Sequence, residues 1–371
     1  MRRVPLVMRS FPLIAVATIG VTVAATPAAA PSGVRSIARM AVPRAVHTAT
    51  ALADGTVLIV GGCTRAGCPL SASGGRVAEL YRPQTRGFVR VGRLNQWRDD
   101  HASTRLPDGR VLIVGGWGVR GVLATTELYD PRRRTFSRGP TMASPRAGTT
   151  ATALGDGRVL IAGGFTDNRP TTASAELFAP TTDRLSALPP MSTPRGGHVA
   201  VRLRDGRVLI AGGLSNGRVT RSSEIFDPRT GRFGAAAAMR APRYKAAAML
   251  LNDGRVFILG GAADIDGDTV YRTTELYDPI RDRFVAGPPM RLPRYKLTGS
   301  VIRFANGDLL VAGGADAVEL YQPRTRRFRV VGRLDSRRLF LTATALRARQ
   351  SLLVGGYDER ITPTRQAWLY R

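Results

Sequence analysis

The sequence has little cysteine, little lysine, few acidic residues and almost no long apolar runs. Two cysteines in 371 residues exclude a small fold held together by many disulfides. Hydrophobic residues make up 43% of the chain, which excludes an intrinsically disordered protein. Only one stretch approaches the length of a membrane span, and it lies at the N-terminus, so a protein with several spans is excluded.

The basic residues are almost all arginine. Of the 55 Lys and Arg residues only Lys245 and Lys296 are lysines, which leaves 53 arginines, and the 27 acidic residues give a formal net charge of +28. A composition bias explains arginine in place of lysine, but it does not explain a two-fold excess of basic over acidic residues. The question raised by the composition is what this positive charge binds.

The first 30 residues have the pattern of an export signal. Arg2, Arg3 and Arg9 make a positive segment, Phe11–Ala25 is apolar and uncharged, and small residues follow up to Ala30. This order is typical of a signal peptide, and about fifteen apolar residues are short for an anchor helix. We therefore expect residues 1–30 to be a signal peptide and the mature protein to be secreted or periplasmic, without a stable membrane span.

The rest of the chain consists of one repeated pattern. Apolar runs end in a glycine pair seven times, beginning at Gly61, Gly115, Gly163, Gly212, Gly260, Gly313 and Gly355. Asp-Gly or Asn-Gly, which favours a two-residue hairpin turn, stands seven residues before six of these pairs. A third strand is predicted around a glutamate in six repeats, namely Glu79, Glu127, Glu176, Glu224, Glu275 and Glu319. Four short strands in a period of 44–54 residues predict the blade of a β-propeller.

The repeat resembles the kelch motif over residues 34–371. Its markers are Pro-Arg before the first strand, Gly-Gly after the second and Glu-x-Tyr-Asp-Pro in the third, as in residues 127–131. The form Asp-Gly-Arg-Val-Leu-Ile-x-Gly-Gly is most similar to the seven-bladed propeller of galactose oxidase-type proteins. This resemblance implies an all-β fold, a seven-bladed kelch-type β-propeller that fills residues 31–371.

The last repeat ends within its third strand, at Tyr370, and lacks a fourth strand. The segment Val34–Met40 precedes the first complete repeat, and Met40 and Arg44 keep the spacing that Met142 and Arg146 have at the end of a fourth strand. We expect Val34–Met40 to complete the last blade and close the ring. Closure would remove the exposed sheet edges that otherwise promote aggregation.

An arginine precedes every innermost strand, which is expected to place seven arginines near the central channel. These residues, called the blade arginines, are Arg44, Arg98, Arg146, Arg195, Arg243, Arg294 and Arg338. Guanidinium groups match carboxylates and phosphates, so the ring is a candidate anion-binding mouth. Pairing with the third-strand glutamates is the alternative, because buried charges are usually paired. The last repeat has Trp368 in place of the glutamate, which makes Arg338 the best candidate for a ligand contact.

Two neighbouring repeats share the segment Pro-Arg-Tyr-Lys. It places Tyr244 and Lys245, and again Tyr295 and Lys296, directly after a blade arginine. The functional interpretation is an aromatic and cationic patch for an acidic sugar or a peptide carboxylate. Duplication of one blade is an equally good explanation of the repetition.

Catalytic chemistry is poorly supported. Galactose oxidase-type enzymes bind copper through two His and two Tyr, with one Tyr cross-linked to a Cys, and the resemblance places an Arg-x-Tyr-His segment before a first strand. The three histidines of the chain occupy this position in different repeats: His47, His101 and His198. None follows a tyrosine, so we expect no cofactor. A periplasmic kelch type that acts as a sialic acid mutarotase suggests a second enzyme, but no acid–base pair stands outside the repeat positions.

Two further features lie in predicted loops. Cys63 and Cys68 flank a short segment of the first blade, and a disulfide is favoured there in an exported protein over a free thiol pair or a metal site. Asp264, Asp266 and Asp268 alternate in the fifth blade and are a candidate for Ca²⁺, although the glycine is not at the EF-hand position.

The sequence favours a binding module over an enzyme. The expected partner is an acidic polysaccharide or an acidic protein segment, held at the face where the connections between blades vary most in length. Arginines in the turns of the opposite face lack interleaved aromatic residues, which argues against nucleic acid. We expect a monomer. The alternative is an oxidase or mutarotase of sugars.

Overall fold

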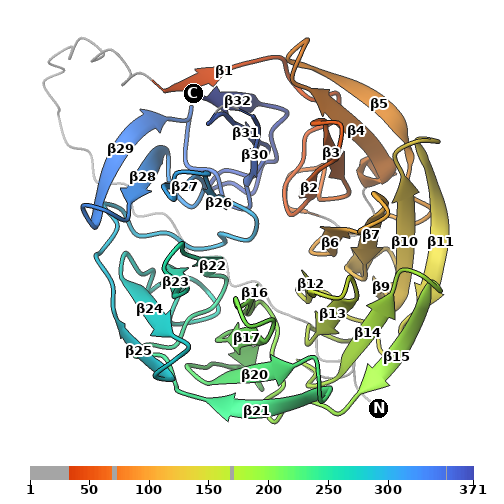
Figure 1. Ribbon diagram of the computed structural model, residues 1–371. Coiled ribbons are helices and arrows are strands. Elements are labelled where there is room, and N and C mark those ends of the chain that lie inside the picture. The colour runs from red at the N-terminus through yellow and green to blue at the C-terminus, as the bar shows by residue number, and fades with distance from the viewer. Residues whose placement is uncertain (1–32, 69–72, 168–170, 348) are drawn as a thin grey trace, which may run out of the picture. The chain divides into compact units, whose positions relative to one another are not determined.

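Seven four-stranded antiparallel sheets surround a central channel in the computed structural model (Figure 1). The structure describes residues 33–68, 73–167, 171–347 and 349–371. Each sheet is a blade, and the first strand of each repeat lies innermost, beside the first strands of the neighbouring blades. The prediction of an all-β, seven-bladed kelch-type propeller is confirmed.

The strands are short and follow the repeat. Blade 1 contains β2 (Thr48–Ala51), β3 (Val57–Val60), β4 (Val77–Arg82) and β5 (Gly87–Arg93), and blade 2 contains β6 (Ala102–Arg105), β7 (Val111–Val114), β10 (Thr125–Asp130) and β11 (Thr135–Thr141). Blade 3 contains β12 (Thr150–Ala153), β13 (Val159–Ala162), β14 (Ala175–Ala179) and β15 (Arg184–Leu188), and blade 4 contains β16 (Val199–Arg202), β17 (Val208–Ala211), β20 (Ser223–Asp227) and β21 (Arg232–Ala236).

Blade 5 contains β22 (Ala247–Leu250), β23 (Val256–Leu259), β24 (Thr274–Asp278) and β25 (Arg283–Ala286), and blade 6 contains β26 (Val301–Arg303), β27 (Leu309–Val311), β28 (Ala317–Gln322) and β29 (Arg327–Arg333). Blade 7 contains β30 (Thr342–Ala345), β31 (Ser351–Val354), β32 (Ala367–Tyr370) and the N-terminal strand β1 (Val34–Ser36). Outside the blades are the two-stranded sheets β8 (Trp117–Gly118) with β9 (Gly121–Val122) and β18 (Leu214–Ser215) with β19 (Arg218–Val219), and the 3-10 helix η1 (Ser73–Arg76).

The hydrophobic core lies between neighbouring blades. The second strand of a blade is buried along its whole length, because both of its faces contact protein, and its sequence is therefore a continuous apolar run rather than an alternating one. Leu112 and Val114 of blade 2 pack against Val159 and Ile161 of blade 3 in one such cluster. Each blade therefore depends on its neighbours for burial of its apolar residues.

The glycine pairs allow the chain to pass between blades at close range. Gly115 has a φ of 59°, and a Cβ atom there would lie 2.1 Å from the carbonyl oxygen of Arg146 in the next blade. Only glycine accommodates both the backbone conformation and this approach.

The N-terminal strand closes the ring as predicted. β1 pairs with β32 so that Val34 lies opposite Tyr370 and Ser36 opposite Trp368. The strand ends at Ser36, but Met40 is 1% exposed and its backbone N–H donates to the carbonyl of Arg365 at 2.9 Å. The segment up to Met40 therefore belongs to the last blade.

The predicted signal peptide lies outside the described residues. Residues 31–371 form one unit by their contacts. Within the described part of this unit, no helix has both the length and the apolar character that a membrane span requires.

Candidate functional site

Six blade arginines form buried ion pairs with the third-strand glutamate of the same blade. The pairs are Arg44–Glu79, Arg98–Glu127, Arg146–Glu176, Arg195–Glu224, Arg243–Glu275 and Arg294–Glu319, with N–O distances of 2.9–3.0 Å. All twelve side chains are at least 95% buried. In these six blades the arginine is therefore paired with the third-strand glutamate, which was the alternative considered from the sequence.

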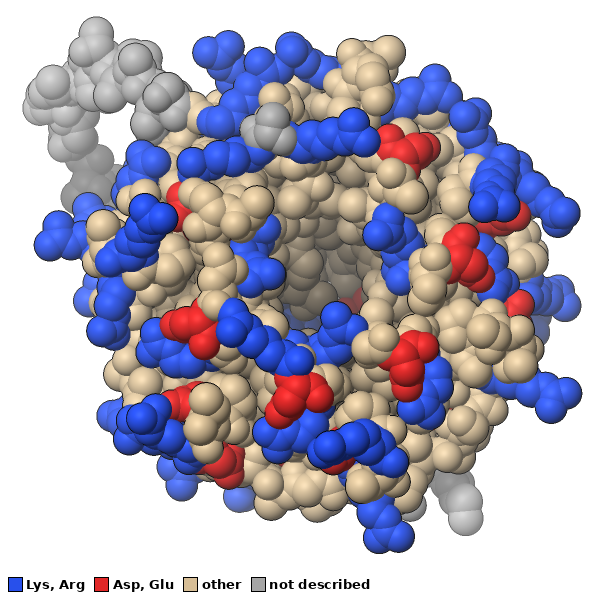
Figure 2. All heavy atoms as spheres, in the orientation of Figure 1, with Lys and Arg blue, Asp and Glu red and all other residues tan. Residues whose placement is uncertain are grey.

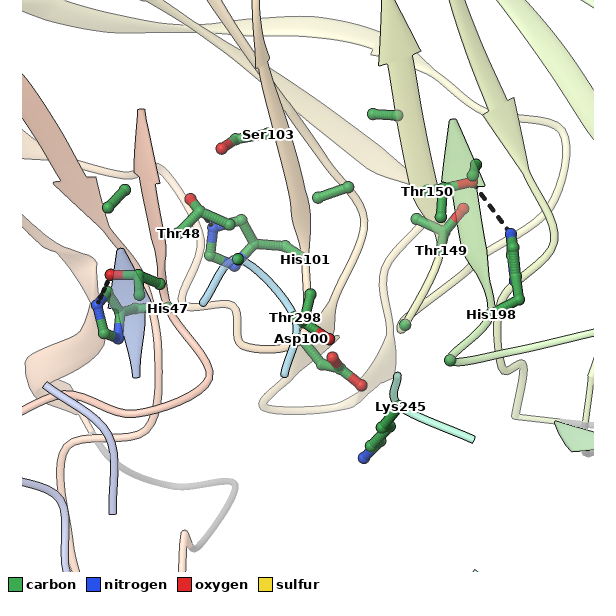
Figure 3. Close-up of a pocket in the computed structure, with 18 of the residues that line it drawn as sticks. His47, Thr48, Asp100, His101, Ser103, Thr149, Thr150, His198, Lys245 and Thr298 are labelled. Atoms are coloured by element: carbon green, nitrogen blue, oxygen red, sulfur yellow. Dashed lines mark hydrogen bonds between the residues drawn. The ribbon is translucent and has the colours of Figure 1, made fainter. Parts of the chain in front are cut away.

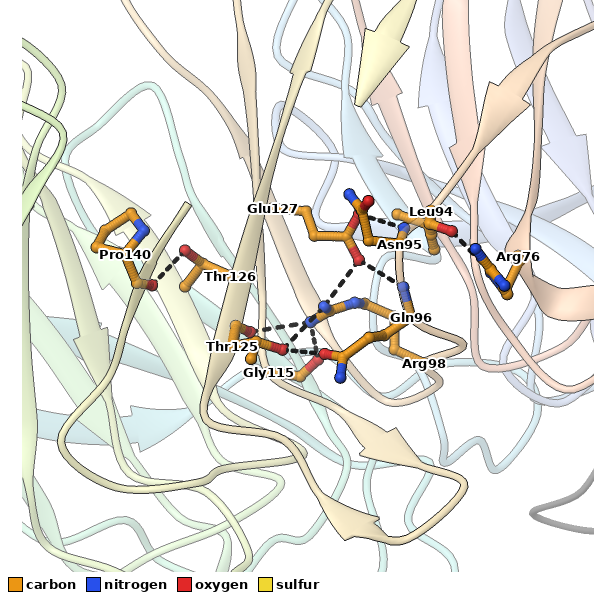
Figure 4. A network of polar contacts seen from close by, with 10 residues as sticks. All are labelled: Arg76, Leu94, Asn95, Gln96, Arg98, Gly115, Thr125, Thr126, Glu127 and Pro140. Carbon is orange, nitrogen blue, oxygen red and sulfur yellow. Dashed lines mark hydrogen bonds and ion pairs between the residues drawn. The ribbon is translucent and has the colours of Figure 1, made fainter. Parts of the chain in front are cut away.

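Blade 2 illustrates the pair (Figure 4). Arg98 donates from Nη1 to the carbonyl of Gly115 at 2.7 Å and from Nη2 to Glu127 Oε1 at 2.9 Å. Glu127 also accepts from the backbone N–H groups of Asn95 and Gln96, in the connection that enters the blade. Burial lowers the pKa of Arg98, and Glu127 opposes this shift. The pair ties the glycine pair, the third strand and the connection together.

The prediction of an anion-binding arginine ring needs correction. The six paired guanidinium groups are buried and already bound to carboxylates, so they are not placed to contact a ligand. Arg338 was the preferred candidate because its blade lacks the glutamate, but it bonds to Asp335 at 3.1 and 2.7 Å and is 7% exposed. An aspartate three residues earlier replaces the missing third-strand acid.

Many arginines of the opposite face are also paired. Those that follow the Asp-Gly turns bond to the aspartate of the same turn: Arg110–Asp108, Arg158–Asp156, Arg207–Asp205 and Arg255–Asp253. In the view of Figure 2 basic side chains are spread around the whole outer edge, with acidic ones between them, and the centre is hollowed. The excess charge therefore does not mark one patch on the face shown.

A ring of left-handed residues surrounds the channel mouth. The second residue after each blade arginine has a φ between 48° and 62°; these mouth residues are Val46, Asp100, Gly148, Gly197, Lys245, Lys296 and Phe340. Their backbones are joined between blades, since Gly148 N–H donates to the carbonyl of Asp100 at 2.7 Å and Lys245 N–H to that of Gly197 at 3.0 Å. This conformation costs about 1–2 kcal/mol for a residue other than glycine, so the lysines occupy it at a cost.

Both lysines of the chain lie in this ring among aromatic side chains. Lys245 Nζ is 4.7 Å from the ring centroid of Phe340 and 5.1 Å from that of Tyr244. Lys296 Nζ is 4.8, 5.9 and 5.4 Å from the centroids of Tyr295, Phe340 and Tyr357. The aromatic and cationic patch predicted from the sequence thus also includes Phe340 and Tyr357 of blade 7, and Phe340 lies close to both ammonium groups.

The two lysines are perturbed in opposite directions: the pKa of Lys245 is raised, because its burial is outweighed by Tyr244 and Asp100, whereas the pKa of Lys296 is lowered. Among the described residues no carboxylate lies within ion-pair distance of the Lys296 Nζ atom. Partial burial, with the positive charges of Lys245 and Arg337, lowers the pKa of Lys296 to about 8. These effects outweigh the attraction of the ring faces for the protonated amine.

A pocket of about 340 Å³ extends from the mouth into the channel (Figure 3). Lys245 and Asp100 line it, together with the hydroxyl groups of Ser103, Thr150 and Thr298. Burial raises the pKa of the neighbouring Asp99 to about 7, with Asp100 adding to the shift and Lys245 opposing it. The pocket offers hydroxyl groups along its wall and both signs of charge at its mouth.

The three histidines join neighbouring blades and are held neutral. The Nε2 atoms of His47, His101 and His198 lie 3.0, 2.9 and 3.1 Å from a threonine hydroxyl of the preceding blade. Burial, with repulsion from the blade arginines, lowers the pKa of His47 and His198 to about 3 and that of His101 well below its usual value. In the described part of the chain no three His, Cys, Asp or Glu side chains converge as a metal site would require.

The two loop predictions have different outcomes. Cys63 and Cys68 form a disulfide. The calcium prediction for Asp264, Asp266 and Asp268 gains no support, because no three His, Cys, Asp or Glu side chains of the described residues are grouped as a metal site would require. The Asp264 carboxylate instead accepts backbone N–H groups of its own loop, from Gly267 at 2.5 Å and Asp268 at 2.9 Å. Those bonds shape the turn.

Sequence reasoning missed the blade 7 contribution and Asp100. Phe340 stands two residues after its blade arginine, as Lys245 and Lys296 do, so the repeat spacing alone would have placed it at the mouth. Nothing in the sequence marks Tyr357, which reaches Lys296 because blades 6 and 7 are adjacent. The guanidinium carbon of Arg337 lies 5.9 Å from the ring centroid of Tyr295. The repeat spacing marks the adjacent Arg338 and gives no signal for Arg337.

The comparisons with known proteins agree with this architecture. A kelch motif matches residues 101–143. No curated protein matches the sequence. Among solved structures the chain is similar to a novel fungal alcohol oxidase with catalytic diversity among the AA5 family, in complex with copper; the TM-score is 0.70 at 12% identity, over 92% of this chain and 76% of that one. The chain therefore has the fold that the repeat resemblance predicted, a seven-bladed β-propeller with a kelch motif at residues 101–143, and this fold is similar to that of the AA5 oxidase.

The residues present do not fit the copper that accompanies this fold in the AA5 oxidase. Each histidine Nε2 atom is bonded to a threonine in a different blade junction, and the rings are at most 7% exposed. The likeness at 12% identity therefore concerns the fold, which supports an interaction module as well as an oxidase relative.

Proposed function

We propose that the protein is an exported binding module that holds the carboxylate groups of an acidic glycan or an acidic protein segment at its channel mouth. Lys245 and Lys296 are the cations that meet the ligand, and Tyr244, Tyr295 and Phe340 form the walls around them. The pocket below the mouth accepts the part of the ligand that bears hydroxyl or amide groups.

One observation supports the proposal above the others. Both lysines of the chain stand side by side in a left-handed backbone conformation, above aromatic rings and without a carboxylate pairing Lys296 among the described residues. Backbone strain of this kind persists where the surrounding structure enforces it, and it concentrates at binding sites. The blade arginines, in contrast, are neutralised within the fold.

The proposal is tested by calorimetric titration with oligogalacturonate, poly-L-glutamate and neutral dextran at low and high salt. We expect one of the two acidic ligands to bind at low salt, more weakly at high salt, and dextran not to bind. Lys245→Met and Lys296→Met should each weaken binding about ten-fold, the loss of about 1.4 kcal/mol that one ion contact supplies.

Arg229→Met is the matched control for charge. Arg229 lies on the opposite face, 83% exposed and paired with Asp227. Equal losses in this variant and in the lysine variants would mean that overall charge, not the mouth, attracts the acid. Absence of binding by every acidic ligand at low salt would overturn the proposal.

A further inference from the structure

A side-chain primary amine occurs at two places only in the sequence, Lys245 and Lys296, and both lie at the channel mouth. Arginine supplies 53 of the 55 basic side chains, including every ion pair described above. A guanidinium group stays protonated in proteins, whereas an amine can lose its proton and then attack a carbonyl carbon. A site that needed only positive charge would be served by arginine, as it is everywhere else in this chain.

We propose that Lys296 is a reactive amine that captures the carbonyl group of a small acid as an imine, while Lys245 and Arg337 hold the carboxylate of the same acid. The inference rests on the proposed function and narrows its ligand to an acid that also bears an aldehyde or ketone, such as the open-chain reducing end of a uronic acid.

The surroundings of Lys296 favour the uncharged amine that this step requires. The ring centroids of Tyr295, Phe340 and Tyr357 lie 4.8–5.9 Å from its Nζ atom, and two cations, Lys245 and Arg337, stand near enough to disfavour the protonated amine. A pKa of about 8 leaves roughly 10–20% of the amine neutral between pH 7 and 7.4, compared with less than about 1% for an ordinary lysine.

The charged groups around the site also explain why Lys245 has the other role. Lys245 and Asp100 line the same pocket, and a nearby carboxylate keeps an amine protonated. Arg337 donates from Nε to the carbonyl of Gly314 and lies 3.6 Å from the exposed carboxylate of Glu359. Both cations therefore remain charged and can attract a ligand carboxylate, which would compete with the exposed Glu359 at Arg337, whereas the pKa of Lys296 is lowered.

The chemistry is a balanced condensation without an oxidant or reductant. The nitrogen lone pair of Lys296 attacks the carbonyl carbon, a C–N bond forms, and the carbonyl oxygen leaves as water with the two protons of the amine. The product is a reversible imine between Lys296 and the acid.

The test is reductive trapping with glyoxylate and cyanoborohydride, followed by mass mapping of the peptides that contain Lys245 and Lys296. With only two lysines in the chain the assignment is unambiguous. We expect Lys296 to be labelled at least about ten-fold faster than Lys245 at neutral pH, with half-maximal labelling near pH 8.

The variant Lys296→Arg separates this inference from the proposed function. It keeps the charge, so oligogalacturonate or poly-L-glutamate should still bind, but rapid labelling should disappear. Equal labelling of both lysines, labelling of neither, or a midpoint near pH 10 would each overturn the inference. Loss of acid binding in Lys296→Met with equal lysine labelling would leave the proposed function standing and remove the reactive amine.

Discussion

At the channel mouth the second residue after each blade arginine has the same left-handed backbone in all seven blades, but the two sides of the ring use it differently. In blades 1 to 4 these residues are a valine, an aspartate and two glycines, and three of the blades add a histidine that joins neighbouring blades. In blades 5 to 7 the same position carries Lys245, Lys296 and Phe340.

The comparison separates residues that hold the ring together from residues that face a ligand. The histidine side forms its contacts within the protein and leaves its rings buried. On the lysine side the backbone is strained, but among the described residues no carboxylate forms an ion pair with Lys296. Since the repeat supplies the same scaffold to both, the difference lies in the side chains alone.

The largest effect is expected at the buried ion pairs, which both sides share. Arg98→Met leaves Glu127 buried without its cation and should lower the free energy of unfolding by about 3–5 kcal/mol. Arg338→Met should cost only about 1 kcal/mol, because its partner Asp335 is 42% exposed and stays hydrated. Urea unfolding of the two variants measures the difference.

The double variant Arg98→Met with Glu127→Leu is the control for these measurements. It removes both buried charges and should recover part of the stability that the single variant loses. Equal losses at Arg98 and Arg338 would contradict the assignment of the seventh blade as the weakly paired one.

The second effect concerns the histidine side and depends on pH. The folded protein keeps these histidines neutral, whereas in the unfolded chain they bind protons below about pH 6.5, so stability should fall as the pH drops from there toward 3. His47 and His198 should each cost about 2 kcal/mol at pH 5, and His101 should act in the same direction. Asp99, whose pKa is raised to about 7, gains stability as the pH falls through this range and offsets one of the three.

His198→Thr tests this prediction with a residue that the repeat already uses, since Thr149 stands at the same position in blade 3. Urea unfolding at pH 7 and pH 5 should show a smaller fall in the variant, by about 2 kcal/mol. An unchanged fall would mean that His198 does not titrate as its burial implies.

The third and smallest effect is expected when a mouth residue of the lysine side is replaced by glycine and a glycine of the histidine side by a larger residue. Lys296→Gly should raise the free energy of unfolding by up to about 1 kcal/mol, because glycine adopts a φ of 57° without strain, and should weaken acid binding. Gly197→Ala should destabilise the fold, because its Cβ atom would lie 2.5 Å from the ring of Tyr244. Thermal unfolding of both variants measures these shifts, and a destabilised Lys296→Gly would contradict the account of strain.

The sequence predicted the ring and its closure because the repeat signals are local. Gly115, Glu127 and Arg98 each recur at fixed spacing, and Met40 marked the strand that completes the last blade. These features depend on turn geometry and on contacts within a blade. They can therefore be predicted from the sequence of a single repeat, without knowledge of the neighbouring blades.

The functional mouth was only partly predictable because it is built between blades. Tyr244, Lys245, Tyr295 and Lys296 were visible as a repeated segment, but the rings of Phe340 and Tyr357 come together with them only in space. For the blade arginines the repeat left ligand binding and pairing with the third-strand glutamates both open, and only the structure shows the buried pairs and the bond of Arg338 to Asp335.

The most direct test of the central claim is a crystal structure of the protein with the acidic ligand that binds best in titration. We predict a ligand carboxylate within hydrogen-bond distance of Lys245 Nζ or Lys296 Nζ, beside the rings of Tyr244, Tyr295 or Phe340. A ligand bound instead to arginines of the opposite face, such as Arg229 or Arg281, would contradict the account.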